Sequence, residues 1–127
     1  MKTKEIGKSG EDFCVQKLAE HGYEILQRNF HSPWGEIDII AKYQGYLVFI
    51  EVKTRTRESI ENATLSVSYR KQAKITKTAM YFLKDFHDSS IEEYRFDVII
   101  VKKEKSTISF RHFENAFLPV EVGDFFV

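Results

Sequence analysis

The sequence has a single cysteine, Cys14, and no apolar run that approaches the roughly 20 residues needed to span a bilayer. One cysteine allows neither an internal disulfide bond nor a zinc site built from several thiolates. The first five residues include two lysines and a glutamate, and no apolar signal region follows them. We therefore expect a cytoplasmic protein with no membrane partner.

A net charge is also lacking, since 19 Lys and Arg balance 19 Asp and Glu. Residues 52–84, however, contain eight Lys or Arg and two Glu, so this segment carries a charge of +6. A local basic segment suits a phosphate backbone, although an ordinary exposed helix face would carry the same charges. The 127 residues predict one domain, with a core over about residues 7–113 and a phenylalanine-rich tail over 114–127.

What the sequence does contain is a strong hairpin signal. Two apolar runs, residues 37–41 and 47–50, flank the pair Gln44-Gly45. Short β-rich runs around a glycine-containing pair predict two antiparallel strands joined by a tight turn. If this pair is the loop, the numbers of paired residues sum to 89.

This register places Asp38 opposite Glu51 and Glu36 opposite Lys53, all on one face of the hairpin. The other face is expected to carry Ile37, Ile39, Val48, Ile50 and Val52. Like charges directly opposite one another destabilise a sheet, and a divalent cation would relieve this. A hard cation such as Mg²⁺ takes oxygen ligands and keeps waters for a phosphate substrate. A solvated hairpin end in which Lys53 pairs with an acid would explain the same residues.

Asp38, followed after twelve residues by Glu51-Val52-Lys53, resembles the PD-(D/E)XK nuclease pattern, with Ile37 where that pattern has proline. Longer motifs resemble the YraN-like bacterial family: Gly10-Glu11, Gly22-Tyr23, Arg28-Asn29-Phe30, Gly35-Glu36-Ile37-Asp38, Phe49-Ile50-Glu51-Val52-Lys53-Thr54-Arg55 and Arg95-Phe96-Asp97-Val98. The resemblance covers about residues 7–101. Members of that family are small nuclease-like proteins, similar to archaeal Holliday-junction resolvases. The resemblance implies a restriction-endonuclease-like core.

It also implies roles for individual residues in a Mg²⁺- or Mn²⁺-dependent site. The implied metal ligands are Asp38, Glu51, Glu11 and the Val52 carbonyl. Lys53 would orient or help deprotonate water, and Gln72 would position the scissile group. Glu11 could instead interact with the dipole of its helix, and Gln72 could hydrogen-bond to backbone. The candidate phosphate contacts are Arg28, on the resemblance alone, and Arg55, Arg70, Lys71, Lys74 and Lys77.

Periodicity and turn residues predict an α/β (α+β) protein with a central mixed sheet and the order α-β-β-β-α-β-β. The expected elements are a helix at 7–21, strands at 23–30, 35–43 and 46–54, a helix within 65–86, and strands at 95–101 and 107–113. Residues 30–35 are expected to form a loop. The buried face of the second helix is predicted to carry Gln72, Ile75, Ala79, Phe82 and Phe86. Asp97 is expected to be structural and paired with Arg95 or a helix lysine.

The function expected from these features is that of a divalent-metal-dependent endonuclease-like protein that hydrolyses phosphodiesters in DNA, with branched DNA among its substrates. The alternative is a non-catalytic nucleic-acid-binding or recombination and repair accessory module. A third hypothesis is a small interaction domain that uses its phenylalanine-rich tail. Junction resolution would require paired active sites, so a homodimer is also considered.

Overall fold

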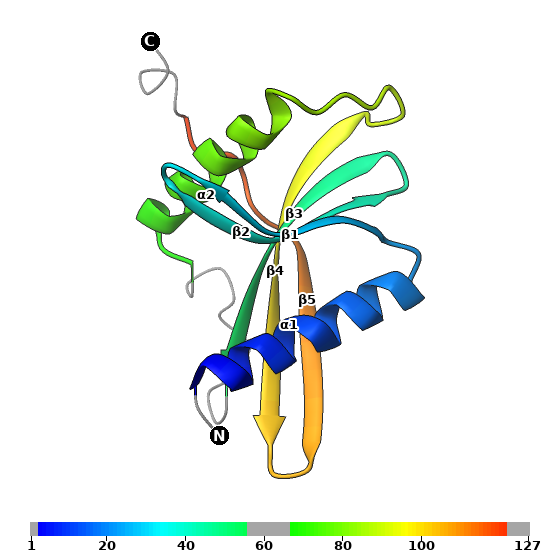
Figure 1. Cartoon of the computed structure of the whole chain (residues 1–127), viewed down its shortest axis with the longest axis vertical. Helices are drawn as coiled ribbons and strands as arrows, with labels where there is room; N and C mark the ends of the chain where they lie inside the picture. The colour runs from blue at the N-terminus through cyan, green and yellow to red at the C-terminus, as the bar shows by residue number, and fades with distance from the viewer. Residues whose placement is uncertain (1–2, 56–66, 122–127) are drawn as a thin grey trace.

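The computed structural model describes the backbone of residues 3–55 and 67–121, and the side chains within these ranges from residue 10 onward. The elements are α1 (Thr3–Glu20), β1 (Glu24–Ser32), β2 (Gly35–Tyr43), β3 (Tyr46–Arg55), α2 (Tyr69–Leu83), β4 (Glu93–Glu104) and β5 (Thr107–Phe117). The predicted order of elements and the α+β class are confirmed (Figure 1). Residues 56–66, and the end of the predicted phenylalanine-rich tail at 122–127, lie outside the described residues.

The five strands form one mixed sheet in the order β1-β2-β3-β4-β5. Neighbouring strands are antiparallel except for β3 and β4, which are parallel and are joined through α2. Gln44 and Gly45 both have positive φ angles, 46° and 85°. Positive φ at both central residues defines the hairpin turn whose twist suits the flanking strands. The pairing of β2 with β3 runs from Tyr43↔Tyr46 to Ile39↔Ile50, which confirms the predicted register over these pairs.

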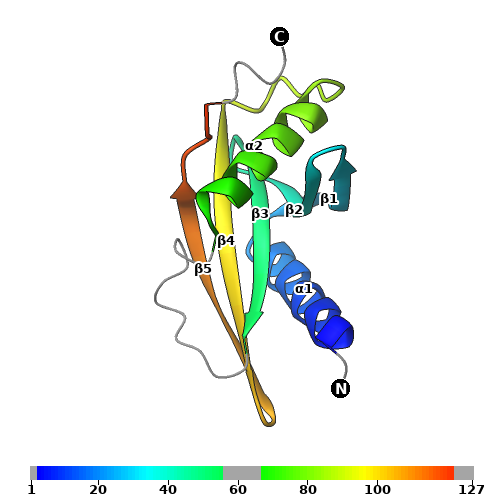
Figure 2. The same ribbon diagram turned by 90° about the vertical axis from the view of Figure 1, so that its left-hand side faces the viewer.

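The two helices pack against opposite faces of the sheet (Figures 1 and 2). On the α2 face a core cluster is built around Ile40, Phe49 and Ile75. On the α1 face a second cluster contains Leu18 and Ile50. The central strands β2, β3 and β4 therefore contribute alternate residues to two apolar layers, one on each face of the sheet.

The connection between β1 and β2 is shorter than the loop predicted at 30–35. β1 continues to Ser32 and β2 begins at Gly35, so only Pro33 and Trp34 lie between them. The Ser32 hydroxyl donates to the Gly35 carbonyl at 3.2 Å and accepts from the Trp34 amide at 3.2 Å. These local bonds close the turn tightly, and composition alone does not reveal them.

Two further boundaries differ from the expectation. α2 begins after Ser68, whose side chain accepts from the Lys71 amide as an N-cap, and Phe86 lies beyond the helix end while still packing on the core. β5 extends to Phe117, past the predicted end at 113. Phe117 is buried and stacks on Phe96 with ring centroids 5.2 Å apart, so part of the predicted tail belongs to the core.

Among the described residues, neither helix combines the length and the apolar character that crossing a bilayer requires. The absence of a membrane partner stays a prediction, as does the cytoplasmic location.

Candidate functional site

The predicted site lies where the sheet divides. Beyond the Ile39↔Ile50 pair, β2 continues to pair with β1 as far as Ser32↔Gly35, while β3 continues to pair with β4. The end of the β1–β2 hairpin thus turns away from the longer strands β3, β4 and β5 (Figure 2). Asp38 and Glu51 occupy the first positions past the last β2–β3 pair, so they stand at the fork between the two parts of the sheet.

At this fork the side chain of Asp38 hydrogen-bonds to the backbone of β3. Its Oδ2 accepts a hydrogen bond from the Val52 amide at 2.8 Å. Only 9% of Asp38 and 7% of Glu51 is exposed, although both side chains are ionisable. Burial raises the pKa of Glu51 to about 8, and a hydrogen bond to Asp38 and the charge of Asp38 act in the same direction. The two acids therefore face each other, as the register predicts.

Two lysines partly compensate the buried acids. The Lys71 ammonium of α2 lies 3.5 Å from Glu51 Oε2. The charges of Lys71 and Lys53 both act to lower the pKa of Glu51, without offsetting its burial. Glu51 Oε2 nevertheless has no hydrogen-bond partner, although it is buried. Such an atom is costly to bury and is a suitable acceptor for a cation or a water.

Glu11 approaches from the α1 side. Burial raises its pKa, the charge of Asp38 adds to this, and Arg28 opposes it. Arg28 lies 3.8 Å from Glu11 Oε1 and 2.7 Å from Asp12 Oδ1, so this predicted phosphate contact pairs with the acids of α1. Glu11 Oε1 and Arg28 Nε are also buried without hydrogen-bond partners. A second set of polar atoms is thus available beside the fork.

Close contact between α1 and β3 explains how Glu11 reaches this position. Gly10 is buried, and a Cβ atom placed on it would lie 2.4 Å from the Thr54 hydroxyl. A glycine at this position lets the helix backbone approach the strand more closely than any other residue would.

Whether these residues suit a metal depends on the kind of ion. Within the described residues, no three His, Cys, Asp or Glu side chains gather closely enough to hold an ion by themselves. A site with a full protein cage, as structural zinc requires, does not fit. Mg²⁺ or Mn²⁺ fits better, because such hard ions take one or two carboxylates and complete their shell with water and substrate oxygens. The roles of Glu11 and the Val52 carbonyl as further ligands stay predictions.

The other predicted residues differ in their contacts and in their exposure. The side-chain amide of Gln72 donates to the Val67 carbonyl at 2.9 Å, the backbone contact considered as its alternative. Glu36 is about half exposed and lies 3.3 Å from His31 Nδ1. Arg70 and Lys74 are exposed on α2.

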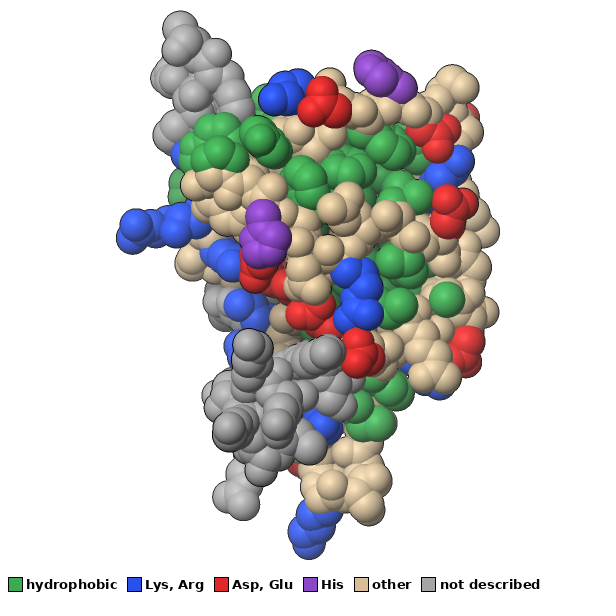
Figure 3. Space-filling view, viewed as in Figure 1, with side chains coloured by type: hydrophobic (Ala, Val, Ile, Leu, Met, Phe, Trp, Pro, Cys, Tyr) green, Lys and Arg blue, Asp and Glu red, His purple; other side chains and the backbone are tan. Residues whose placement is uncertain are grey.

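Arg55 and Lys77 both take part in contacts, and Arg55 donates to the Thr54 carbonyl at 3.2 Å. On the face drawn in Figure 3, acidic and basic side chains lie side by side. Positive charge on that face is therefore interleaved with negative charge.

One predicted face is wrong. Ile39, Val48 and Ile50 belong to the α1-side core as expected, and Val52 packs against it, but Ile37 belongs to the core beneath α2. The predicted alternation fails at Asp38 because the hairpin turns over at this level. In the β1–β2 ladder Asp38 lies between the residues paired as Arg28↔Ile39 and Phe30↔Ile37, and the β1 residue in the same interval is Asn29, which has a φ of 52°.

Pattern reasoning missed two features of the site. The contact between Lys71 and Glu51 joins residues that are far apart in the sequence, and no local pattern reveals it. The left-handed backbone of Asn29 had a signal, because asparagine is depleted in strands and tolerates positive φ.

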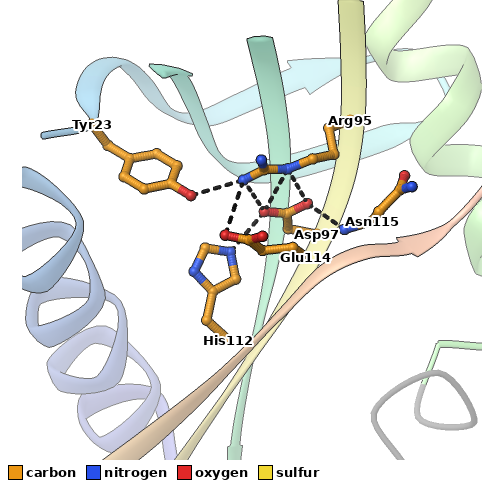
Figure 4. Close-up of polar contacts among 6 residues, drawn as sticks. All are labelled: Tyr23, Arg95, Asp97, His112, Glu114 and Asn115. Atoms are coloured by element: carbon orange, nitrogen blue, oxygen red, sulfur yellow. Dashed lines mark hydrogen bonds and ion pairs between the residues drawn. The ribbon is translucent and has the colours of Figure 1, made fainter. Parts of the chain in front are cut away.

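A second buried polar cluster lies on the α1 side of β4 and β5 (Figure 4). Asp97 is fully buried and accepts from Arg95 Nε at 2.9 Å, from the Asn115 amide at 2.8 Å and from the Nε2–H of His112 at 2.6 Å. Burial alone would raise the pKa of Asp97, but the bonds from His112, Arg95 and the Asn115 amide hold it below its ordinary value. Arg95 also donates to the Tyr23 hydroxyl at 2.7 Å. The predicted pairing of Asp97 with Arg95 is confirmed.

Comparison with known proteins identifies relatives over most of the chain. The model of the uncharacterised protein family UPF0102 matches residues 10–101. A UPF0102 protein of Thermodesulfovibrio yellowstonii is 44% identical over 115 residues, which cover 89% of this chain and 96% of the relative. A UPF0102 protein of Dictyoglomus turgidum is 40% identical over 119 residues, which cover 92% of this chain and 100% of the relative. The matched residues 10–101 contain the acids of the fork and, from the second cluster, Tyr23, Arg95 and Asp97, whereas His112 and Asn115 lie beyond residue 101.

Proposed function

The chain belongs to the uncharacterised protein family UPF0102, and we propose that it is a divalent-metal-dependent endonuclease-like protein that acts on DNA, with branched DNA among its substrates. The names of these relatives state no activity. Membership of this family agrees with the resemblance to the YraN-like family in the sequence motifs. The link to PD-(D/E)XK nucleases is part of the proposal.

The observation that supports it most strongly is the pair of buried acids at the fork. Burial and the neighbouring Asp38 charge raise the pKa of Glu51 to about 8, so proximity of the two carboxyls is unfavourable when both are ionised. A purely structural site would be more stable with one of them replaced by an apolar or amide side chain. Two close carboxylates with an acceptor atom that lacks a hydrogen bond suit a bound cation.

Each residue of the fork has a role that follows from its position. Asp38 Oδ2 accepts from the Val52 amide, and this bond orients the carboxylate. Glu51 supplies a second carboxyl group, which its raised pKa keeps mostly protonated at pH 7 and which a bound cation would favour in the ionised form. When bound, Mg²⁺ or Mn²⁺ would supply charge neutralisation at the phosphoryl oxygens and a more acidic water.

The lysines complete the arrangement. Lys53 lies on the same strand as Glu51, two residues further on, where its ammonium could orient an attacking water or offset charge on the phosphoryl group. The Lys71 ammonium forms an ion pair with Glu51 and would contact a phosphate that approaches between α2 and β3. Arg70 and Lys74, exposed on the same helix, would contact neighbouring phosphates.

One contact favours the second candidate, a non-catalytic nucleic-acid-binding or repair accessory module. Lys71 already places a positive charge 3.5 Å from Glu51, so part of the compensation is present without a metal. In such a module the fork would hold α2 against β3 and the cations of α2 would bind phosphates. DNA binding that is unaffected by EDTA, without any product, would select this function.

The deciding experiment incubates linear, flapped and four-way DNA with the protein, with and without Mn²⁺. The wild type is compared with Asp38→Asn and with Glu104→Gln, a control that removes an exposed carboxylate paired with Lys102 at 3.2 Å. We expect metal-dependent product from the wild type and the control, and none from Asp38→Asn. Equal cleavage by all three proteins would refute the assignment of Asp38.

A further inference from the structure

Asn29 has a backbone conformation that is unusual inside a strand. Its φ of 52° lies in the left-handed region, yet it is the sixth of the nine residues of β1. Residues other than glycine adopt this region at a cost, and such positions persist only where surrounding structure enforces them. Strained residues cluster near functional sites, so its neighbours in space are informative.

Asp38 lies in the same interval of the β1–β2 ladder as Asn29. The β1–β2 register pairs Arg28 with Ile39 and Phe30 with Ile37, which leaves Asn29 and Asp38 between these two pairs. The strained residue and the proposed metal ligand therefore share one level of the hairpin.

The side chains on either side of this level show what the strain does. Arg28 contacts Asp12 of α1, whereas the Phe30 ring packs on the Phe82 ring of α2 at 5.2 Å between centroids. Residues two apart in a regular strand point to the same face, but these two reach helices on opposite faces.

The same exchange occurs on β2. Ile39 belongs to the α1-side core and Ile37 to the α2-side core, although they too are two residues apart. Both strands of the hairpin thus turn over between the Arg28↔Ile39 and Phe30↔Ile37 pairs. One residue in the left-handed conformation can produce such a local change of twist, as it does in bulges.

We propose that Asn29 is a positioning residue for the site: its left-handed backbone turns the hairpin over and brings the Asp38 carboxylate to the Val52 amide and to Glu51. In a regular hairpin β2 would continue along β3, and a main-chain carbonyl instead of a side chain would meet the Val52 amide. Turning the hairpin over frees that amide for Asp38 Oδ2. The inference rests on the proposed function only for the use of Asp38 as a metal ligand.

The chain contains a matched control for the strain itself. Asn115 in β5 has a φ of 53°, almost the same as that of Asn29, but its amide bonds to Asp97 in the second polar cluster. Replacing either asparagine by alanine adds comparable backbone strain, because alanine tolerates positive φ poorly. Only the change at Asn29 should affect the fork.

The test measures amide hydrogen exchange at Val52 by NMR, relative to the amide of the core residue Ile99, in Asn29→Gly, Asn29→Ala and Asn115→Ala. We expect wild-type protection of Val52 in Asn29→Gly, because glycine adopts positive φ freely. In Asn29→Ala the ratio of the Val52 exchange rate to the Ile99 rate should rise about 5- to 30-fold. In Asn115→Ala this ratio should stay at the wild-type value.

Unchanged protection of Val52 in Asn29→Ala, or loss of protection in Asn29→Gly, would overturn the inference. So would an equal effect of Asn115→Ala on the same ratio. If Asn29→Ala does not fold, Asn29→Gly decides alone, since it keeps the conformation and removes the side chain. Mn²⁺ titration of the same proteins separates the two proposals: a wild type that binds no Mn²⁺ refutes the metal site and leaves the exchange result for Asn29 intact.

Discussion

The Asp38 carboxylate accepts a hydrogen bond from the Val52 amide, in the place where a main-chain carbonyl of β2 would accept it in a regular ladder. Where the β2–β3 ladder ends, at Ile39↔Ile50, the Val52 amide donates at 2.8 Å to Asp38 Oδ2 and not to a main-chain carbonyl of β2. The same side chain therefore completes the backbone bonding of the sheet and supplies an acid to the candidate site. Substitutions at this position have to be read for both effects.

The two effects of Asp38 can be separated with two variants. In Asp38→Asn the amide oxygen can still accept from the Val52 amide, so we expect the free energy of unfolding to stay close to that of the wild type. Asp38→Ala leaves a buried N–H without a partner and should cost about 1–3 kcal/mol. Urea denaturation measures the difference, and both variants should lose Mn²⁺ affinity. Equal destabilisation by Asn and Ala would show that the hydrogen bond to Val52 contributes little.

The raised pKa of Glu51 predicts a pH dependence of stability. Its ordinary value is 4.5 and its value in the folded protein is about 8. Between these values the folded state holds a proton that the unfolded state has released. The free energy of unfolding should therefore fall as the pH rises from about 4.5 to about 8, and the contribution is fully present only below that window. In Glu51→Gln this fall should be much smaller. Denaturation of both proteins across the window tests it, because other groups cancel in the difference.

The same pKa predicts a link between cation binding and proton release. Mn²⁺ binds the ionised carboxylate, so at pH 7 its uptake should displace the proton of Glu51. Calorimetric binding heats measured in two buffers of different ionisation enthalpy should therefore differ, and affinity should increase up to about pH 8. Binding heats that do not depend on the buffer would exclude Glu51 as a ligand.

The second polar cluster predicts a large effect on stability. Asp97 is fully buried and pairs with Arg95, so Asp97→Ala leaves a mostly buried guanidinium without its carboxylate. Breaking such a pair from one side typically costs about 3–5 kcal/mol. Glu114→Gln is the control: Glu114 is 60% exposed and lies 3.9 Å from the same guanidinium, and its removal should cost at most about 1 kcal/mol. Similar urea midpoints for the two variants would contradict this account.

The approach of α1 to β3 predicts a pair of compensating substitutions. Gly10→Ala places a Cβ atom 2.4 Å from the Thr54 hydroxyl, so the helix that carries Glu11 must shift or Thr54 must rotate. We expect destabilisation of about 1–3 kcal/mol from this overpacking. The double variant Gly10→Ala/Thr54→Ala should recover most of the loss, because the hydroxyl is the nearest obstacle. Thermal denaturation of both variants, with Thr54→Ala alone as the control, tests the contact.

Local chemistry made much of this arrangement predictable. The positive φ angles of Gln44 and Gly45 form the turn that fixes the β2–β3 register, and that register places Asp38 opposite Glu51. The order of helices and strands follows from apolar periodicity, which burial enforces in each element.

The parts that were not predicted depend on contacts or on exceptions to periodicity. Alternation assumes a regular strand, so it misplaced Ile37, which lies past the left-handed residue Asn29. The ion pair between Lys71 and Glu51 requires α2 to lie against the strand, a matter of tertiary packing. The basic segment marked Lys71 as a candidate phosphate contact, but the sequence does not identify the acid that it meets.

The reversal of the hairpin has a consequence for how the protein loses its structure. Because Ile37 packs beneath α2 and Ile39 beneath α1, a single short stretch of β2 belongs to both apolar layers. Unfolding of either apolar layer removes packing contacts from residues 37–39 and therefore destabilises the other layer as well. The described part of the chain should consequently behave as one cooperative unit, and its two helices should not detach in separate transitions.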